Sequence, residues 1–430
     1  MIISKGKQYD SSMQDVLLEQ MAHEINETLA VKTLPQELVV AAISELGAKV
    51  ARGEFDDLIE KLPVDGKEHY KQLAVTLLSR ENLEFKIKTE LGEDFRPSYV
   101  TDPPLGLSKL RVTAMPLGVI LHIAAGNVDG LPAFSLAEGL LTGNINILKL
   151  PGADNGLSLQ IIGALIDIEP ALADFIYVFD TPSTDVQAIK KMADLSDGIA
   201  VWGGDAAIAA VRRFAAPGTR IIEWGHKLSF AYISGYSEKE RELDALAHHI
   251  METGQLLCSS CQTIFIDTDR MEDVYDFCRD FLPHLEHTAA AHRPSSIGAR
   301  AELTLRQYTA RLESVLQKKN ETDTKVFRGV GCSLIPRADS ELELSDMFGS
   351  CPVKRLPERD LLPSLRLKKG YLQTAGLICS DEKRAYLTEL LAKSGVVRIT
   401  GAGEMSSFFA GEAHDGEYPL RRYLRIVNAN

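Results

Sequence analysis

The chain has 430 residues, of which 45% are hydrophobic and 25% charged, and its formal net charge is −13 at pH 7. This length allows two or three domains with complete hydrophobic cores. The acidic balance argues against a general nucleic-acid-binding protein, because binding to a phosphate backbone needs a basic face.

The opening residues, MIISKGKQYD, lack the apolar core of a signal peptide. No stretch approaches the roughly 18 apolar residues that predict a membrane span. We therefore expect a cytoplasmic protein without a membrane span. The six cysteines are too sparse to predict a disulfide framework.

The first predicted elements are helices. Apolar residues recur at helical spacing over residues 13–30 and 35–53, and residues 69–92 are predicted to form a third long helix. The prolines within residues 93–110 predict a connecting loop.

From residue 116 onward, short apolar strands alternate with helices. Strands are predicted at residues 117–124, 145–150, 175–180, 198–203 and 219–224. A second alternating section follows, with strands predicted at residues 228–234, 262–267, 325–330, 351–357, 374–380 and 396–400, and helices at residues 238–255, 271–292, 301–320 and 381–395. Such alternation predicts βαβ units and mostly parallel sheets, which bind ligands at the carboxyl ends of their strands.

Cys258 and Cys261 lie three residues apart, where a predicted helix gives way to a strand. A structural zinc site needs four ligands, and the sequence has no second Cys-x-x-Cys and no suitably spaced histidine pair beyond His284 and His287. A thioredoxin-like redox pair is disfavoured because it would open a helix after the first strand of a small domain. The residues alone leave two main interpretations, which are two buried cysteines or one nucleophilic thiolate beside a cofactor-binding fold.

Five further positions lie at the edge of the first predicted sheet and could contact a ligand. Asn127 follows a strand and is either an oxyanion donor or a turn residue. Lys149 ends a strand and is either a ligand for a ribose or phosphate group or a solvated strand end. Gly203 and Gly204 open a helix where backbone N–H groups can face a phosphate. Glu223 ends a strand beside a tryptophan and is either a general base or a surface carboxylate.

The order and spacing of these positions resemble the aldehyde dehydrogenase superfamily. LLTGNINILKLP (140–151) is similar to that superfamily's ALAAGNTVVMKP, WGGDAAI (202–208) to its GS turn, and EWGHKLS (223–229) to its ELGGKSP loop. Within the superfamily, the chain from about residue 110 to its end resembles the bacterial bioluminescence (LuxC-type) long-chain fatty acyl-CoA reductases. The shared motifs are PLGVILHIAAGN (116–127), VWGG (201–204), EWGHK (223–227), CSSCQ (258–262), LQTAGL (372–377) and HDG (414–416).

The resemblance implies an aldehyde dehydrogenase-like α/β fold with two Rossmann-like parallel-sheet domains and a helical N-terminal region. Residues 1–230 would hold the helical region and the NAD(P)-binding domain, and residues 231–404 the catalytic domain. Residues 405–430 would form an arm that returns to the first domain or to an oligomer interface.

The resemblance also implies roles for single residues. Cys258 stands four residues before Gln262, as the nucleophile of acylating members does before a glutamine or arginine. Asn127 would hold the oxyanion, and Glu223 would deprotonate the cysteine or move protons. Ala125-Gly126 replaces the superfamily's Pro-Trp, which opens the pocket.

Five positions are assigned to the cofactor by the same resemblance, namely Lys149, Trp202, Gly203, Gly204 and Trp224. Gly152 stands where NAD-preferring members carry an acid that would repel a 2′-phosphate. Its identity, with Lys149 nearby, favours NADPH over NADH.

We therefore expect an acyl-CoA reductase that reduces a long-chain fatty acyl thioester to an aldehyde through an S-acyl-cysteine. The alternatives are an NAD(P)-dependent aldehyde dehydrogenase that forms an acid, an acyl carrier or transferase without reduction, and a non-catalytic assembly subunit. We expect a homo-oligomer and an acyl-supplying protein partner, and we expect neither a metal nor nucleic acid to bind.

Overall fold

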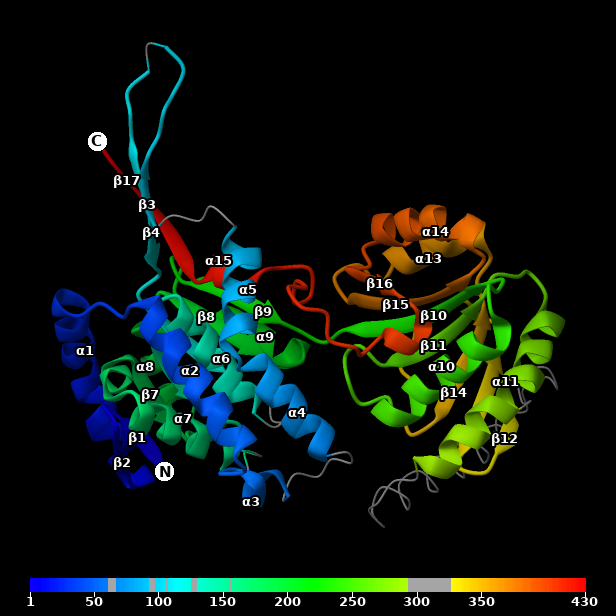
Figure 1. The fold of residues 1–430 in the computed structure, drawn as a ribbon, viewed down its shortest axis with the longest axis horizontal. Helices are drawn as coiled ribbons and strands as arrows, with labels where there is room; N and C mark the ends of the chain where they lie inside the picture. Colours follow the sequence, from blue (N-terminus) through cyan, green and yellow to red (C-terminus); the bar gives the residue numbers. More distant parts are fainter. Residues whose placement is uncertain are drawn as a thin grey trace. The chain divides into compact units, whose positions relative to one another are not determined.

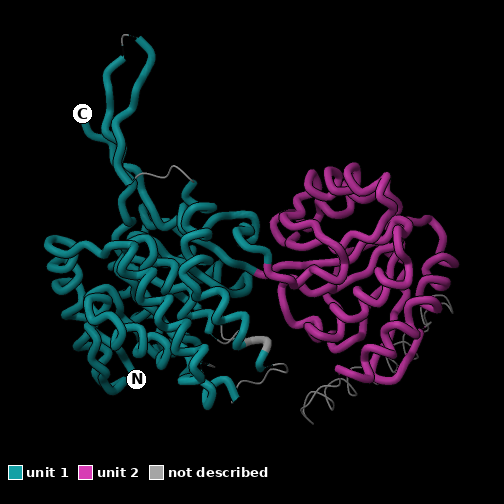
Figure 2. Tube along the Cα trace, viewed as in Figure 1, with its two compact units in different colours: residues 1–225, 409–430 teal, residues 226–408 magenta. Residues whose placement is uncertain are grey.

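The computed structural model describes residues 1–60, 67–92, 97–105, 107–124, 130–152, 154, 156–292 and 326–430. The chain divides into two compact units, which are coloured separately in Figure 2. Unit 1 comprises residues 1–225 and 409–430, and unit 2 comprises residues 226–408. Among the described helices, none is both long and apolar enough to cross a bilayer.

Unit 1 begins with a short hairpin and a set of helices. These elements are β1 (Ile2–Ser4), β2 (Lys7–Tyr9), η1 (Ser11–Met13), α1 (Gln14–Val31), α2 (Gln36–Ala51), α3 (Asp56–Ile59), α4 (Lys67–Leu77) and α5 (Arg80–Leu91). The prediction of one helix over residues 69–92 is wrong, because the chain breaks between α4 and α5. Ser79 has an extended conformation, and its side chain accepts a hydrogen bond from Asn82 N, which caps α5.

The main sheet of unit 1 has the strand order β2-β1-β7-β6-β5-β8-β9 (Figure 1). Its parallel strands are β5 (Val119–Ile123), β6 (Ile145–Lys149), β7 (Ile176–Phe179), β8 (Gly198–Trp202) and β9 (Arg220–Trp224). The connecting elements are α6 (Leu131–Leu141), α7 (Leu157–Ile168), η2 (Pro170–Phe175), α8 (Val186–Asp194) and α9 (Asp205–Phe214). Strands β6, β7 and β8 are buried along their whole length, as expected for parallel strands covered on both faces.

Unit 2 contains a second sheet, with the order β12-β13-β14-β11-β10-β15-β16. Its strands are β10 (Leu228–Ser234), β11 (Cys261–Ile266), β12 (Phe327–Gly329), β13 (Cys332–Arg337), β14 (Ser350–Arg355), β15 (Leu372–Cys379) and β16 (Arg398–Thr400). All neighbouring pairs are parallel except β12 with β13. The helices are α10 (Lys239–Thr253), α11 (Met271–Ala291), α13 (Glu358–Arg366), α14 (Asp381–Ser394) and η4 (Ala402–Glu404). The helix predicted over residues 301–320 lies outside the described residues.

A third, antiparallel sheet projects from unit 1 and includes the last strand of the chain (Figure 1). It consists of β17 (Leu424–Ala429), β4 (Arg111–Pro116) and β3 (Ser98–Val100), and α15 (Pro419–Arg422) precedes β17. Arg220 fastens this segment to β9 by donating to the carbonyls of Arg422 and Leu424 at 2.8 and 2.7 Å. Strand β3 lies within residues 93–110, which were predicted to form a loop.

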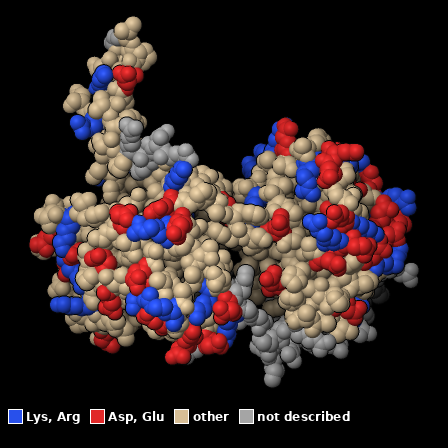
Figure 3. All heavy atoms as spheres, in the orientation of Figure 1, with Lys and Arg blue, Asp and Glu red and all other residues tan. Residues whose placement is uncertain are grey.

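Charges of both signs are intermixed on the face of the molecule seen in Figure 3. The projecting sheet carries fewer charged residues on this face than the body of unit 1. Its exposed side chains include Tyr99, Val100, Ile426 and Val427.

Candidate functional site

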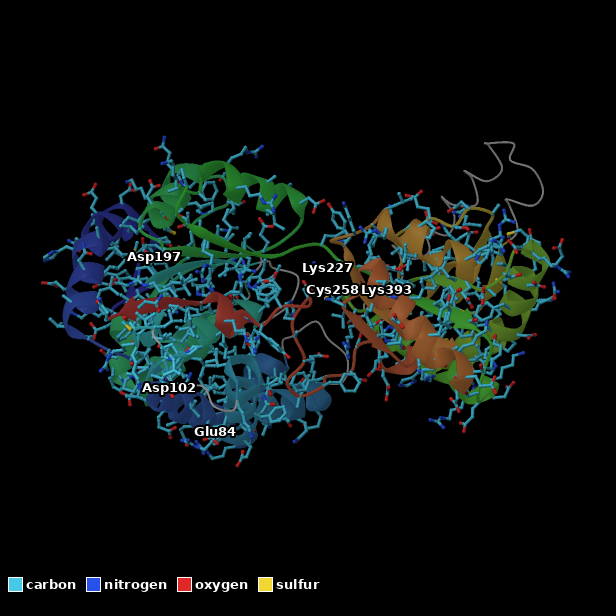
Figure 4. The ribbon with its side chains drawn as sticks, turned by 90° about the horizontal axis from the view of Figure 1, so that it is seen from above. Glu84, Asp102, Asp197, Lys227, Cys258 and Lys393 are labelled. Carbon is cyan, nitrogen blue, oxygen red and sulfur yellow. The ribbon has the colours of Figure 1, made fainter. Side chains whose placement is uncertain are left out.

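Cys258 lies on the loop that joins α10 to β11 in unit 2. Helix α10 ends at Thr253 and is capped by Gly254, whose φ of 54° is left-handed, and Gln255 keeps a left-handed φ of 61°. Strand β11 then begins at Cys261. Cys258 therefore sits just before the amino end of a central strand, with its side chain exposed (Figure 4).

Burial distinguishes Cys258 from the other cysteines. All six cysteines belong to the described part of the chain, and the five besides Cys258 are buried. Burial, with a contribution from Glu286, raises the pKa of Cys332 to about 11. Burial and the neighbouring thiol of Cys261 raise the pKa of Cys351. Since the thiolate is the nucleophilic form, chemistry at a buried thiol of this kind is suppressed.

The two cysteines of the Cys-x-x-Cys pair occupy different environments. Cys261 is fully buried in β11, and its thiol donates to the carbonyl of Thr263 at 3.5 Å. Across the described ranges, no three His, Cys, Asp or Glu side chains gather in a way that could hold a metal ion. The pair thus combines one exposed thiol with one interior thiol.

Cys258 is held at both its backbone and its sulfur. Gln373 Nε2 donates to Cys258 Sγ at 3.2 Å, and Ser229 Oγ donates to the Cys258 carbonyl at 2.7 Å. The adjacent Ser259 shares a 2.7 Å hydrogen bond with Ser406. The sequence motifs that contain Gln373 and Ser229 indicated no role for either residue, because these contacts join segments far apart in the chain.

The buried side-chain amides of Gln255 and Gln262 hold the loop that carries Cys258. Gln255 Nε2 donates to the carbonyl of Cys261 at 2.9 Å, and Gln255 Oε1 accepts from Gly349 N at 3.0 Å. Gln262 Nε2 donates to the carbonyl of Gln255 at 2.9 Å, while Gln262 Oε1 accepts from the backbone and hydroxyl of Ser345. Gln262, which served only as a spacing marker in the sequence, is therefore a structural support of the cysteine loop.

A buried histidine completes this support. His249 Nε2 accepts a 3.1 Å hydrogen bond from Cys261 N at the start of β11. Burial, assisted by the charge of Arg398, lowers the pKa of His249 to about 4. His249 is therefore neutral at physiological pH and acts as an acceptor.

The carboxyl edge of the unit 1 sheet carries most of the other predicted site residues. In the parallel ladder Ile123 pairs with Lys149, and Val201 pairs with Glu223. The strand ends therefore place Lys149 and Glu223 at one edge of the same sheet. Asn127 lies outside the described residues, so its role as an oxyanion donor stays a prediction.

Lys149 is a buried cation at the end of β6. Its side chain is only 5% exposed, and burial lowers its pKa. Within the described ranges its ammonium has neither a hydrogen bond nor an ion pair. A lysine at the carboxyl end of a parallel strand stands where such sheets bind ligands, so this position suits a bound anion.

Gly203 and Gly204 form the turn between β8 and α9. Gly203 N donates to the carbonyl of Trp224 at 3.1 Å, which fixes the turn to the next strand. A Cβ added to Gly204 would meet nothing within 4 Å, and Gly204 caps α9 without a side chain. The first backbone N–H groups of α9 are thus near open space, as phosphate binding at a helix start requires.

Glu223 makes a two-point ion pair with a neighbouring helix. Arg212 Nε and Nη2 of α9 donate to the two carboxylate oxygens of Glu223 at 2.5 and 2.6 Å. The Glu223 side chain is 26% exposed, and Arg212 is 64% exposed. Glu223 can therefore take part in proton transfer only when its ion pair with Arg212 is broken.

Trp202 and Trp224 lie in a buried aromatic cluster. Their ring centroids are 5.4 Å apart, and the His414 ring lies 5.0 and 4.8 Å from them. Trp202 Nε1 donates to Ser135 Oγ at 2.9 Å. Both tryptophans are less than 10% exposed, so they support the strand ends. His414 comes from the HDG motif, for which the sequence indicated no contact.

A buried ionic cluster joins α5, α6 and α15. Lys86 Nζ lies 2.9 Å from Glu138 Oε1 and also pairs with Glu90, whose carboxylate accepts from Leu420 N. Burial raises the pKa of Glu138 to about 7 against the opposing effect of Lys86. For Lys86, burial is outweighed by the two carboxylates, and the pKa is raised. One ammonium thus faces two acids, and Glu138 retains a proton near neutral pH.

These features support covalent chemistry in unit 2 and anion binding in unit 1. An exposed, hydrogen-bonded thiol can attack an electrophilic carbonyl. A buried lysine and an open helix start can hold a phosphate-bearing molecule at the carboxyl edge of a parallel sheet.

Comparisons with known proteins show the family of the chain. The family model of the acyl-CoA reductases (LuxC) matches residues 35–426. A long-chain acyl-protein thioester reductase of Vibrio harveyi is 25% identical over 360 residues, which cover 83% of this chain and 72% of that protein.

Solved structures of aldehyde dehydrogenases share the fold. Lactaldehyde dehydrogenase from Escherichia coli superposes with a TM-score of 0.67 at 14% identity, covering 98% of this chain and 92% of that one. A putative methylmalonate-semialdehyde dehydrogenase from Sinorhizobium meliloti, complexed with NAD, gives a TM-score of 0.71 at 12% identity, covering 100% and 96%. The chain is therefore an oxidoreductase with an aldehyde dehydrogenase-like fold, and it belongs to the acyl-CoA reductase (LuxC) family.

Proposed function

We propose that this protein reduces a long-chain acyl thioester to an aldehyde, with Cys258 as the nucleophile. The observation that carries the proposal is the exposed Cys258 thiol, held by Gln373 in a chain of this family. The Vibrio harveyi relative is named for acyl-protein thioesters, which supports an acylated protein as an acyl donor besides acyl-CoA.

In the first step, the Cys258 thiolate attacks the carbonyl carbon of the thioester. A new carbon–sulfur bond forms, and the original thiol leaves with its electron pair and takes up a proton. The product is an S-acyl group on Cys258. We assign the oxyanion to the Asn127 amide and proton transfer to Glu223. Because Glu223 pairs with Arg212, this transfer requires the ion pair to open.

We further assign nucleotide binding to unit 1 and acyl chemistry to unit 2. The residues of unit 1 fit a nicotinamide dinucleotide, because Lys149 is buried without a partner among the described residues and Gly204 leaves the start of α9 open. When bound, the reduced nicotinamide would supply the hydride for the acyl carbonyl. The carbon–sulfur bond to Cys258 then breaks, which releases the aldehyde and returns the sulfur as a thiolate. Trp202 and Trp224 would support this edge, and Gly203 would fix its turn.

We propose NADPH as the preferred cofactor. A cationic Lys149 and an uncharged Gly152 suit an additional phosphate better than an acidic residue would. Lys149→Met should lower kcat/KM for NADPH about tenfold more than for NADH, equivalent to ~1.4 kcal/mol. Equal losses with both cofactors would contradict the preference.

The function is tested with a long-chain acyl-CoA and an acylated carrier protein as substrates. Oxidation of the reduced cofactor, release of the free thiol and formation of aldehyde should occur in equal amounts. Cys258→Ala should abolish both the acyl adduct seen by mass spectrometry and the aldehyde, whereas Cys379→Ala, at a buried cysteine of β15, should keep both. The proposal fails if the protein instead converts aldehyde and NAD⁺ to free acid, or if the adduct forms but no reduced cofactor discharges it.

We also propose that the third sheet joins copies of this chain in a homo-oligomer. Ile426 and Val427 are 62% and 42% exposed on β17, an edge strand among the described residues. Exposed apolar edge strands favour pairing with another chain. Sedimentation should show Ile426→Asp shifting the protein toward monomer, while Val31→Asp, at an exposed apolar position of α1, leaves its mass unchanged. A wild-type monomer would refute this proposal.

A further inference from the structure

The side chain of Gln373 is placed to act on the sulfur of Cys258. Gln373 is the second residue of β15 and is only 7% exposed. Its Nε2 donates to Cys258 Sγ at 3.2 Å, although the two residues are 115 positions apart in the chain. An amide N–H that points at sulfur favours the thiolate over the thiol, because a hydrogen bond to the charged form stabilises that form.

The orientation of the Gln373 amide is set by its neighbour. Thr374 Oγ1 donates to Gln373 Oε1 at 3.4 Å, so the carbonyl side of the amide is turned toward the hydroxyl and the NH₂ side toward the sulfur. Thr374 is fully buried. This contact supports the amide orientation that presents an N–H group to the sulfur.

Ser229 connects the same strand to the backbone of Cys258. Its Oγ donates to the Cys258 carbonyl at 2.7 Å and accepts from Thr374 N at 3.0 Å. The ladders of β10 with β11 and with β15 both shift register next to Ser229. An interruption of the ladders thus lets one hydroxyl tie the cysteine loop to β15, as irregular strand pairing near active sites often does.

We propose that Gln373 is a catalytic residue that stabilises the thiolate of Cys258, and that Ser229 and Thr374 position it. The proposal rests on Cys258 being the nucleophile of the proposed function. Its test uses alkylation of the sulfur by iodoacetamide, which needs neither acyl substrate nor cofactor. Failure of the reductase assay and failure of this inference are therefore separate outcomes.

The experiment measures the rate of Cys258 alkylation against pH, with mass spectrometry to confirm the modified residue. Gln373→Leu keeps the approximate volume of the side chain and removes the donor. The midpoint of the alkylation profile of Gln373→Leu should lie about one pH unit above that of wild type. Below both midpoints the variant should therefore contain about tenfold less thiolate than wild type. Above both midpoints its rate should rise about threefold, because a more basic thiolate is intrinsically more nucleophilic.

Two further variants keep the test independent of one substitution. Gln373→Glu replaces the donor with a carboxylate and should raise the midpoint more than Gln373→Leu does. Thr374→Val removes the hydroxyl that orients the amide and should raise it less. Gln187→Leu, an exposed glutamine on α8 of unit 1, is the matched control and should leave the profile unchanged.

A merely structural role for Gln373 predicts a different pattern. Looser packing would change the alkylation rate by one factor at every pH and leave the midpoint in place. Midpoints of the folded Gln373→Leu, Gln373→Glu and Thr374→Val proteins that all coincide with the wild-type midpoint would overturn the inference.

Discussion

Burial decides which single side chains of this protein are available for chemistry. Cys258 is exposed while Cys261, three residues later, is enclosed in a strand. Lys149 is buried at the carboxyl edge of the unit 1 sheet, and its pKa is lowered by that burial. Glu138 is buried beside a cation and still holds a proton near neutral pH, since burial raises its pKa to about 7.

Glu138 should make the stability of unit 1 depend on pH. Its pKa is 4.5 in the unfolded chain and about 7 in the folded one. Between these two pH values the folded state binds more protons than the unfolded state. The contribution of Glu138 to the free energy of unfolding therefore decreases as pH rises. Glu138→Gln removes the titration. The free energy of unfolding of the variant minus that of wild type should therefore increase by up to about 3 kcal/mol between pH 5 and pH 8.

Urea unfolding followed by tryptophan fluorescence measures this effect, because both tryptophans, Trp202 and Trp224, belong to unit 1. Glu84→Gln, at an exposed acid on α5, is the matched control and should show a difference that does not change with pH. A pH-independent difference for Glu138→Gln would show that the carboxyl group is ionised throughout.

At the scale of elements, the cysteine loop depends on contacts with a distant segment. Gln255 has a left-handed φ of 61° and bridges the start of β11 to Gly349. Met347, Phe348 and Gly349 are three successive residues with left-handed φ, and they form the turn whose Gly349 N–H binds Gln255. In the same turn, Phe348 N donates to the carbonyl of Gly254. Such strained conformations persist only where the surrounding bonds hold them.

Gln255→Leu should destabilise unit 2 by about 3 kcal/mol, because it leaves the buried Cys261 carbonyl and Gly349 N–H without partners. Urea unfolding followed by circular dichroism would measure the loss. Gln187→Leu should change stability by less than about 0.5 kcal/mol. An equally small effect of Gln255→Leu would mean that water or a rearranged turn replaces its hydrogen bonds.

The elements that the sequence predicted best are those with local signals. Buried runs such as residues 145–150 indicated parallel strands, and the order of motifs identified the family. The β1-β2 hairpin was missed because three-residue strands show too little alternation. The break at Ser79 was missed because apolar spacing continues across it.

The candidate site shows the same division. Cys258 and Lys149 have sequence signals, namely a motif and a strand end. Gln373 and Ser229 stand inside the motifs LQTAGL and EWGHKLS, but neither motif indicated a contact with Cys258, because the contacts span 115 and 29 residues and depend on strand register. Register across a sheet is set by packing that no short stretch of sequence records.

At the scale of the whole molecule, each unit contains a buried histidine that stays neutral. Burial lowers the pKa of His122 in unit 1 and of His249 in unit 2 to about 4, with opposition from Asn146 in the first case and assistance from Arg398 in the second. The unfolded chain binds a proton at each position below pH 6.5, so both histidines remove stability as pH falls from 6.5 to 4. In unit 1, protonation of Glu138 offsets part of this loss.

Unit 2 should therefore be the more acid-sensitive unit. Between pH 6.5 and 4.5 its free energy of unfolding should fall by about 2 to 3 kcal/mol from His249 alone, and that of unit 1 by much less. Tryptophan fluorescence follows unit 1, while circular dichroism follows both units, so the two urea transitions should separate on acidification. His249→Gln should bring them together again. If the fluorescence and circular dichroism transitions coincide at both pH 6.5 and pH 4.5, the two units do not differ in acid sensitivity.

The chain builds unit 2 from one continuous segment but returns to unit 1 for its last strand. During synthesis, residues 226–408 emerge from the ribosome before residues 409–430, which complete the described part of unit 1. Until then Arg220 lacks the two carbonyl partners at Arg422 and Leu424, and β4 has no β17 beside it. The unit to which we assign nucleotide binding thus begins before unit 2 but gains β17 only after unit 2 has been made, and until then the edge of β4 that pairs with β17 is open.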